Sequence, residues 1–197
     1  MREPFFQQCD LEPQPGDPLI AEMALGEGAN WGSLRHCTLP EPPPRPLAFR
    51  LREHRSAYGF WLDVKGLAEL PPAELIDPTA FAGALGCVLL LEPEQDGRDF
   101  RYRIFGSRIA QMFGQDMTGR RLSEFPELAA RNTLRQYHLV MRARRAIYSE
   151  HDAMPEVSLV VRWCRLVLPF TDRLGGISRL LVTNVPVERP VLEALAR

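Results

Sequence analysis

Apolar side chains recur with the period of a β-strand in two neighbouring segments. Residues 86–93 (GCVLLLEP) form a short apolar run, and residues 99–106 (DFRYRIFG) alternate apolar side chains with arginine. Asp96-Gly97 between them is a strong turn signal. The pattern therefore predicts an antiparallel hairpin, whose second strand turns three side chains inward: Phe100, Tyr102 and Ile104.

Two helical patterns follow this hairpin. Residues 107–114 (SRIAQMFG) predict one or two turns, and residues 126–146 predict the longest helix, which starts at Pro126. Each has one apolar face, made by Ile109, Met112 and Phe113 in the first helix and by Ala130, Leu134, Tyr137 and Met141 in the second.

Three more strands are predicted near the end of the chain, over residues 146–151, 157–170 and 177–187. Asp172 and the Gly175-Gly176 pair mark the turn between the last two. The order of elements is therefore two strands, a group of helices and three strands.

An imperfect helical stripe precedes this core. Residues 47–62 alternate apolar and charged side chains, and we expect Gly59 to interrupt the helix. The pattern predicts a helical cap over residues 47–70. Asp77 is the expected N-cap of a short helix that follows, with Pro78 in its first position.

Residues 1–46 form an acidic, proline-broken arm. They hold half of the 18 prolines and carry a net charge of −4, from seven acids and three arginines. The run PEPPPRP at residues 40–46 favours an extended polyproline conformation. We interpret the arm as a linker, and a stiff spacer is favoured over an SH3-type ligand at residues 43–46. The main domain then spans residues 71–189, with a short tail over residues 190–197.

Composition limits the partners and the compartment. The 197 residues carry a formal net charge of −1, so no global field attracts nucleic acid or an anionic membrane. No leader segment and no apolar stretch of membrane-spanning length is present, and we expect a cytoplasmic protein. A reducing compartment also suits the four widely spaced cysteines, Cys9, Cys37, Cys87 and Cys164.

No motif for catalysis or metal binding stands out. Neither glycine loop has the spacing of a phosphate-binding loop. Ser107 follows Gly106 but lacks the second glycine of a nucleophile elbow. His138 and His151 have no second ligand at i+3 or i+4, which argues against a metal site. For His138, a hydrogen-bonded structural role is favoured over that of a proximal haem ligand.

Arginines gather between residues 116 and 145, where the local charge excess is +4. Such a patch can neutralise phosphates or dock an acidic protein or the acidic arm, although arginines around a helix are usually its solvated face. No nucleic-acid recognition pattern accompanies them, so nucleic acid is disfavoured. The candidate partner surface consists of Arg120, Arg121, Arg135, Arg142, Arg144 and Arg145.

Residues 75–187 resemble a compact bacterial family of PAS domains. The motifs that carry the resemblance are Asp77-Pro78, DFRYRIFGSRI at 99–109, FGQDMTGR at 113–120 and the last two strands. The resemblance implies an α+β fold, a five-stranded antiparallel sheet with helices over one face. The N-terminal helical cap and the extended arm are additions to that fold, and the resemblance does not cover them.

In such a fold the space between sheet and helices is either packed solid or holds a small ligand. The candidate lining residues are Tyr102, Ile104, Ile109, Met112, Phe113, Met117, Thr118, Leu134, Tyr137, His138, Met141 and Thr183. We assign no catalytic residue, metal ligand or cofactor. A flavin with a cysteine adduct is disfavoured because the cysteine motif of such domains is absent, and haem is disfavoured as well.

The resemblance implies a non-enzymatic sensory or regulatory protein that forms a homodimer and signals through protein contacts. The alternative is a ligand-free scaffold whose arginine surface binds an acidic protein or nucleic acid.

Overall fold

The structure is a computed structural model, and the residues it describes are 49, 51–125, 127–152 and 160–188. The acidic arm over residues 1–46, with its polyproline run and two of the four cysteines, lies outside the described residues. So does the tail over residues 190–197. The predictions for these segments stay predictions.

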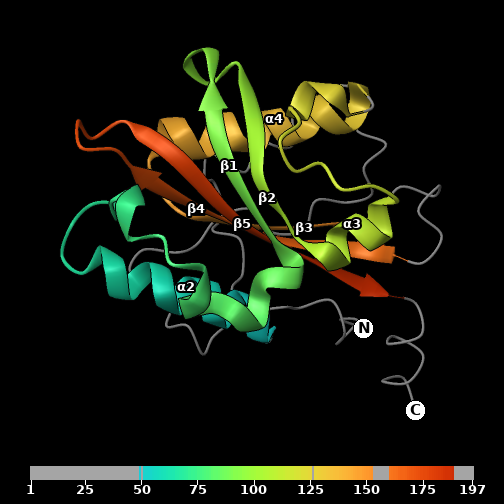
Figure 1. Cartoon of the computed structure of the whole chain (residues 1–197), viewed down its shortest axis with the longest axis horizontal. Helices are drawn as coiled ribbons and strands as arrows, with labels where there is room; N and C mark the ends of the chain where they lie inside the picture. The colour runs from blue at the N-terminus through green and yellow to red at the C-terminus, as the bar shows by residue number, and fades with distance from the viewer. Residues whose placement is uncertain (1–48, 50, 126, 153–159, 189–197) are drawn as a thin grey trace, which may run out of the picture.

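Five strands form one antiparallel sheet in the order β2-β1-β5-β4-β3 (Figure 1). The hairpin consists of β1 (Val88–Glu94) and β2 (Asp99–Phe105). The three later strands are β3 (Ile147–Asp152), β4 (Val160–Thr171) and β5 (Ile177–Glu188). The predicted strands and the α+β class are thereby confirmed.

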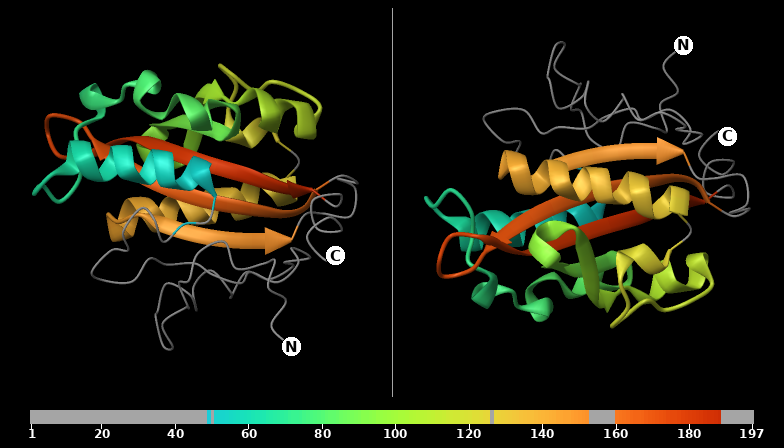
Figure 2. Two further views of the ribbon diagram at one scale, coloured as in Figure 1. Left: turned by 90° about the horizontal axis from the view of Figure 1, so that it is seen from below. Right: turned by 90° about the horizontal axis from the view of Figure 1, so that it is seen from above.

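Helices cover both faces of this sheet. Seen from opposite sides, α2 (Arg52–Lys65) lies over one face and α4 (Glu127–Ala143) over the other (Figure 2). The N-terminal cap is therefore a helix that closes the second face. The remaining helical segments are η2 (Ala73–Leu75), η3 (Pro78–Cys87), η4 (Gln95–Gly97), α3 (Ser107–Phe113) and η5 (Leu122–Glu124).

The helix α2 runs without a break through Gly59, so the expected interruption is wrong. A glycine inside a helix costs roughly 1 kcal/mol relative to alanine. Tyr58, Phe60 and Trp61, on both sides of Gly59, are buried against the sheet. Burial of an apolar side chain of this size contributes roughly 2 kcal/mol, and packing thus outweighs the local preference.

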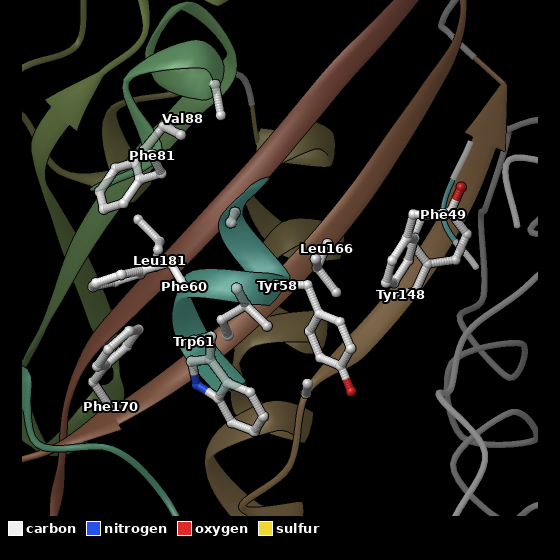
Figure 3. Close-up of a cluster of buried hydrophobic side chains, with 14 of the residues drawn as sticks. Phe49, Tyr58, Phe60, Trp61, Phe81, Val88, Tyr148, Leu166, Phe170 and Leu181 are labelled. Carbon is white, nitrogen blue, oxygen red and sulfur yellow. The ribbon is translucent and has the colours of Figure 1, made fainter. Parts of the chain in front are cut away.

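The face under α2 carries an aromatic core (Figure 3). Tyr58 stacks on Trp61 with ring centroids 5.9 Å apart, and the ring of Phe60 lies 5.2 Å from that of Phe81 in η3. The Nε1 of Trp61 donates a hydrogen bond to the carbonyl oxygen of Pro169 at 2.9 Å. These contacts fix α2 and η3 to β4.

The face under α4 carries a second core. From the helix it receives Tyr137, Leu139 and Val140. The sheet supplies one row that crosses four strands, Leu89, Val182, Val167 and Ile147. The central strands are therefore buried on both faces, which explains why they read as nearly continuous apolar runs.

A β-bulge at Arg103 changes which face of the sheet the later side chains of β2 point to. The register against β1 shifts there, so that Tyr102 and Ile104 are consecutive pairing positions and Arg103 is skipped. Tyr102 stays in the α4-face core, whereas Ile104 lies opposite Leu90, which packs against the α2-face core. The prediction that Ile104 faces inward beside Tyr102 is wrong, because one extra residue reverses the alternation and Phe105 takes that place.

The predicted cap and hairpin turn are both present. The Asp77 carboxylate accepts a hydrogen bond from the backbone nitrogen of Thr79 at 2.9 Å, at the start of η3. Asp96 and Gly97 adopt left-handed backbone angles, with φ of 58° and 82°. A side chain on Gly97 would place its Cβ 3.1 Å from the Cε of Met141 on α4, so this glycine also lets the hairpin tip approach the helix.

Gly106 lies very close to the backbone of Gly86. A Cβ at this position would lie 2.5 Å from the carbonyl oxygen of Gly86, which is backbone and cannot rotate away. We expect Gly106→Ala to lower the free energy of unfolding by about 1–3 kcal/mol in urea titrations. Gly83→Ala is the control, since a Cβ there meets nothing within 4 Å. Equal stability of the two variants would contradict this packing.

His54 is buried between α2 and the sheet. Its Nε2 donates a hydrogen bond to the carbonyl oxygen of Cys164 at 3.2 Å, and its ring meets that of Tyr148 edge-on at 5.4 Å. Burial lowers the pKa of His54 from 6.5 to about 4. Between these two values the unfolded chain binds a proton that the folded chain does not, so acidification favours unfolding.

We therefore expect the free energy of unfolding to fall by about 3 kcal/mol through His54 alone as the pH drops from 7 to 4. His54→Gln removes the titrating ring. The difference in free energy of unfolding between wild type and variant should therefore show this pH dependence. The check is urea unfolding at a series of pH values. Parallel stability curves for the two proteins would show that His54 does not titrate as described.

Candidate functional site

Six polar side chains meet inside the otherwise apolar core under α4. All six are buried, and they come from β2, α4, β4 and β5. We call them the interlayer cluster, and its members are Tyr102, Thr133, Gln136, Tyr137, Arg165 and Asn184. The helix brings three of them to one face because their positions are i, i+3 and i+4. The sheet pairs Arg165 directly with Asn184.

Arg165 is the charged member of the cluster, and its side chain is only 6% exposed. Its Nε donates to the Oδ1 of Asn184 at 3.3 Å, and its Nη1 donates to the Oε1 of Gln136 at 3.0 Å and to the Oγ1 of Thr133 at 3.5 Å. All three acceptors are neutral. Within the described part of the chain, no carboxylate forms an ion pair with Arg165 and no acceptor takes a hydrogen bond from its Nη2.

Tyr102 and Tyr137 contribute two hydroxyl groups to the cluster. Burial raises the pKa of Tyr102 well above its ordinary value, and the nearby phenol of Tyr137 raises it further. Burial also raises the pKa of Tyr137, against the opposing charge of Arg165. Both phenols therefore stay protonated and can donate. The Oη of Tyr137 lies close enough to the phenol of Tyr102 for each to affect the pKa of the other, but it makes no hydrogen bond of proper geometry to any described residue.

Asp99 fixes the segment that adjoins the cluster. Its Oδ1 accepts from the backbone nitrogens of Phe100 at 2.8 Å and Ser123 at 3.2 Å, and its Oδ2 accepts from the Ser123 hydroxyl at 2.6 Å. Its negative charge is one of the smaller causes that raise the pKa of Tyr102. Asp99 therefore holds η5 against β2 and is not an ion-pair partner of Arg165.

Most of the predicted apolar lining residues belong to the core under α4. Met112 and Phe113 on α3 are half-buried, and Phe113 packs on Phe125 with ring centroids 4.6 Å apart. The residues packed into the core itself are Ile109, Met117, Leu134 and Met141. They share this core with Tyr102 and Tyr137 of the interlayer cluster.

Two predicted threonines lie elsewhere. Thr118 is exposed, and its hydroxyl donates to the carboxylate of Asp116 at 2.7 Å, where it closes a local turn. Thr183 is registered beside Val88 and Leu166, which belong to the core under α2. Because side chains alternate along a strand, Thr183 faces α2. The structure corrects both predictions.

His138 does not enter the cluster either. Its side chain is exposed, and its Nε2 donates to the carbonyl oxygen of Gly97 at 2.6 Å. This bond joins α4 to the tip of the hairpin, beside the contact of Met141 with Gly97. This hydrogen bond agrees with the structural role favoured for His138.

The predicted arginine surface is partly neutralised. Arg135 and Arg142 are exposed and Arg145 is half-buried. The other three form ion pairs, Arg120 with Glu124 at 2.8 Å, Arg121 with Glu94 at 2.8 Å and Arg144 with Glu69 at 2.9 Å. Glu94 and Glu69 lie outside residues 116–145, so they do not enter the local charge excess of +4. That excess therefore overstates the positive charge that this surface presents.

The described residues offer little for a metal or a cysteine adduct. Within them, no group of three or more His, Cys, Asp or Glu side chains could hold a metal ion. Cys87 and Cys164 are buried and pack with Val185, apart from the interlayer cluster. The helices found in the described ranges are all too short or too polar to cross a membrane.

Four members of the cluster are absent from the sequence-based prediction: Thr133, Gln136, Arg165 and Asn184. Arg165 does carry a signal, because it interrupts an apolar strand at a position where a charge is costly. Thr133 and Gln136 carry none, since polar residues on a long helix ordinarily face solvent. Their burial depends on how α4 lies on the sheet.

Comparison with known families agrees with the fold. A family model of the PAS domain matches residues 50–183, well over half of the chain, and the protein therefore belongs to the PAS domain family. The match begins upstream of residue 75, so α2 falls within it. No curated protein and no solved structure matches the chain.

The Tyr137 hydroxyl gives a direct test of the cluster. Because its contact with Tyr102 does not have hydrogen-bond geometry, we expect Tyr137→Phe to change the free energy of unfolding of the ligand-free protein by less than about 1 kcal/mol. Tyr148→Phe is the matched control, since that hydroxyl donates to the Glu150 carboxylate at 2.8 Å. Its loss should cost about 2 kcal/mol in urea unfolding. A loss of the same size in Tyr137→Phe would mean that its hydroxyl is already satisfied.

Proposed function

We propose that this PAS domain protein is a non-enzymatic sensory or regulatory protein of the cytoplasm. In this proposal a small ligand binds between α4 and the sheet, at the interlayer cluster. Its binding is transmitted through protein contacts of a homodimer.

The observation that carries the proposal is a polar cluster in an apolar core, in which one buried hydroxyl group lacks a hydrogen-bond partner of proper geometry. Buried polar groups are nearly always hydrogen-bonded, and one left without a partner costs about 1–3 kcal/mol. The buried Oη of Tyr137 has no hydrogen-bond partner of proper geometry among the described residues. No acceptor is found there for the Nη2 of Arg165 either, although this atom is not among the fully buried ones. A bound ligand supplies the missing partners, and an apolar site with a few convergent polar groups is typical of small-molecule binding.

The contacts of α4 support a route by which binding is transmitted. Its face toward the sheet contributes three of the six cluster residues, and its far end reaches other segments through Arg144. Arg144 pairs with Glu69, which follows α2, and donates to the carbonyl oxygen of Gly175 in the β4–β5 turn at 3.1 Å. A ligand with different affinities for two positions of α4 shifts their populations and thereby changes these contacts.

Two exposed leucines support a contact with another protein chain. Leu67 follows α2 and Leu174 lies in the β4–β5 turn, and both are almost fully exposed. Arg144 bonds to neighbours of both, Glu69 and Gly175, so the two leucine segments lie near the same end of α4. Exposed apolar side chains at this end suit a contact between copies of the chain.

Competing functions have less support. An enzyme needs a titratable pair at the site, whereas the two phenols of the cluster stay protonated. A scaffold that binds an acidic protein or nucleic acid needs free arginines, whereas Arg120, Arg121 and Arg144 are paired with acids.

Native mass spectrometry of the purified full chain tests the proposal. We expect the native mass to exceed the denatured mass by that of one small molecule. Hydrogen exchange then shows whether ligand binding affects α4. Its amides should exchange about tenfold more slowly in the ligand-bound protein than in protein from which the ligand was removed by denaturation and refolding.

Tyr148→Phe, which alters a hydroxyl on the other face, should retain the ligand as the wild type does. Equal native and denatured masses, together with identical exchange of α4 before and after stripping, would contradict a ligand-dependent sensor.

A further inference from the structure

We propose that the ligand of the interlayer cluster is an organic carboxylate with one negative charge and an apolar body. This inference rests on the proposed ligand-binding function and specifies its chemistry. The carboxylate group contacts the guanidinium of Arg165 and the hydroxyl of Tyr137, and the apolar body lies against the core side chains under α4.

The first reason is the uncompensated charge of Arg165. A buried guanidinium is costly unless an anion faces it, and the three acceptors bonded to Arg165 are neutral. The same strand provides the contrast. Arg162 is equally buried on the opposite face, where its Nη1 lies 3.5 Å from the Oε2 of Glu150. The fold thus supplies a carboxylate for one arginine of β4, and the other is left for a ligand.

The second reason is the kind of hydrogen bonds that remain open. The Nη2 of Arg165 and the Oη of Tyr137 are both donors, because the pKa of the phenol is raised by burial. A carboxylate accepts through both of its oxygens and matches the planar fork of a guanidinium. A neutral carbonyl would accept as well, but it would leave the buried positive charge without a counter-ion.

The third reason is the balance of charge and apolar surface. Arg165 is the one basic member of the cluster, and the core on the same face of the sheet is otherwise apolar, with Val167 and Val182 next along β4 and β5. A phosphate ester carries nearly two charges near neutral pH and needs more donors than this site offers. One arginine in an apolar core therefore favours a monocarboxylate over a phosphate or a nucleotide.

The test uses the full chain and begins with the molecule released on denaturation. We expect that molecule to form a methyl ester, which identifies a carboxyl group. The stripped and refolded protein is then heated with benzoate or hexanoate, and with benzamide or hexanamide as neutral probes of the same shape. The acids should raise the melting temperature by about 4 °C at tenfold excess over their Kd, and the amides should not. Phenyl phosphate should act no better than the amides.

Two variants connect the effect to the site. Arg165→Met should abolish the difference between acid and amide, because it removes the charge that the carboxylate pairs with. Tyr137→Phe should weaken benzoate binding about tenfold without destabilising the protein. If Arg165→Met does not fold, this variant alone tests whether benzoate binds at the cluster. Tyr148→Phe should leave benzoate binding unchanged.

The outcomes separate this inference from the proposed function. A released molecule without a carboxyl group, or amides that stabilise as well as acids, overturns the carboxylate assignment and leaves a ligand-binding protein. No released molecule and no response to any probe overturns both. If nothing is released but the acids alone stabilise, and Tyr137→Phe weakens them, the assignment is supported.

Discussion

The antiparallel pairing of β4 with β5 is the interaction on which the rest of the structure depends. It sets the register that sends Leu166 and Leu181 into the core under α2, and Val167 and Val182 into the core under α4. Because both faces of this ladder are covered by a helix, every side chain in its middle enters one core or the other. A polar residue on these strands therefore has to find its partner inside the protein or in a bound molecule.

The sequence predicted what depends on neighbouring residues. The strands, the hairpin turn at Asp96-Gly97 and the cap at Asp77 follow from alternation and turn chemistry, which act over a few residues. The PAS resemblance supplied the sheet as a whole, with helices against it. The inward position of Tyr102 and the apolar residues of the core under α4 also followed, because each is a local consequence of strand or helix period.

What the sequence did not predict depends on distant contacts. The bulge at Arg103 reverses the alternation of side chains between the two faces of β2. Nothing in the neighbouring residues distinguishes a bulge from a regular strand. Thr183 was assigned to the wrong face of the sheet. Which face it points to depends on how β5 is registered against its neighbouring strands. The ion pairs of Arg121 and Arg144 join segments far apart in the chain, so a local count of charges cannot include them.

The attachment of α4 has a mechanical consequence. Its later turns are fastened, by His138 and Met141 to the hairpin tip and by Arg144 beyond its end, whereas the cluster residue Thr133 lies toward its start. A helix of 17 residues is about 25 Å long, and one held in this way behaves as a lever with its pivot near one end. A change of volume beneath Thr133 and Gln136, which bond to Arg165, then tilts the helix about the hairpin tip. The contacts of the hairpin tip with His138 and Met141 thus set the point about which α4 turns.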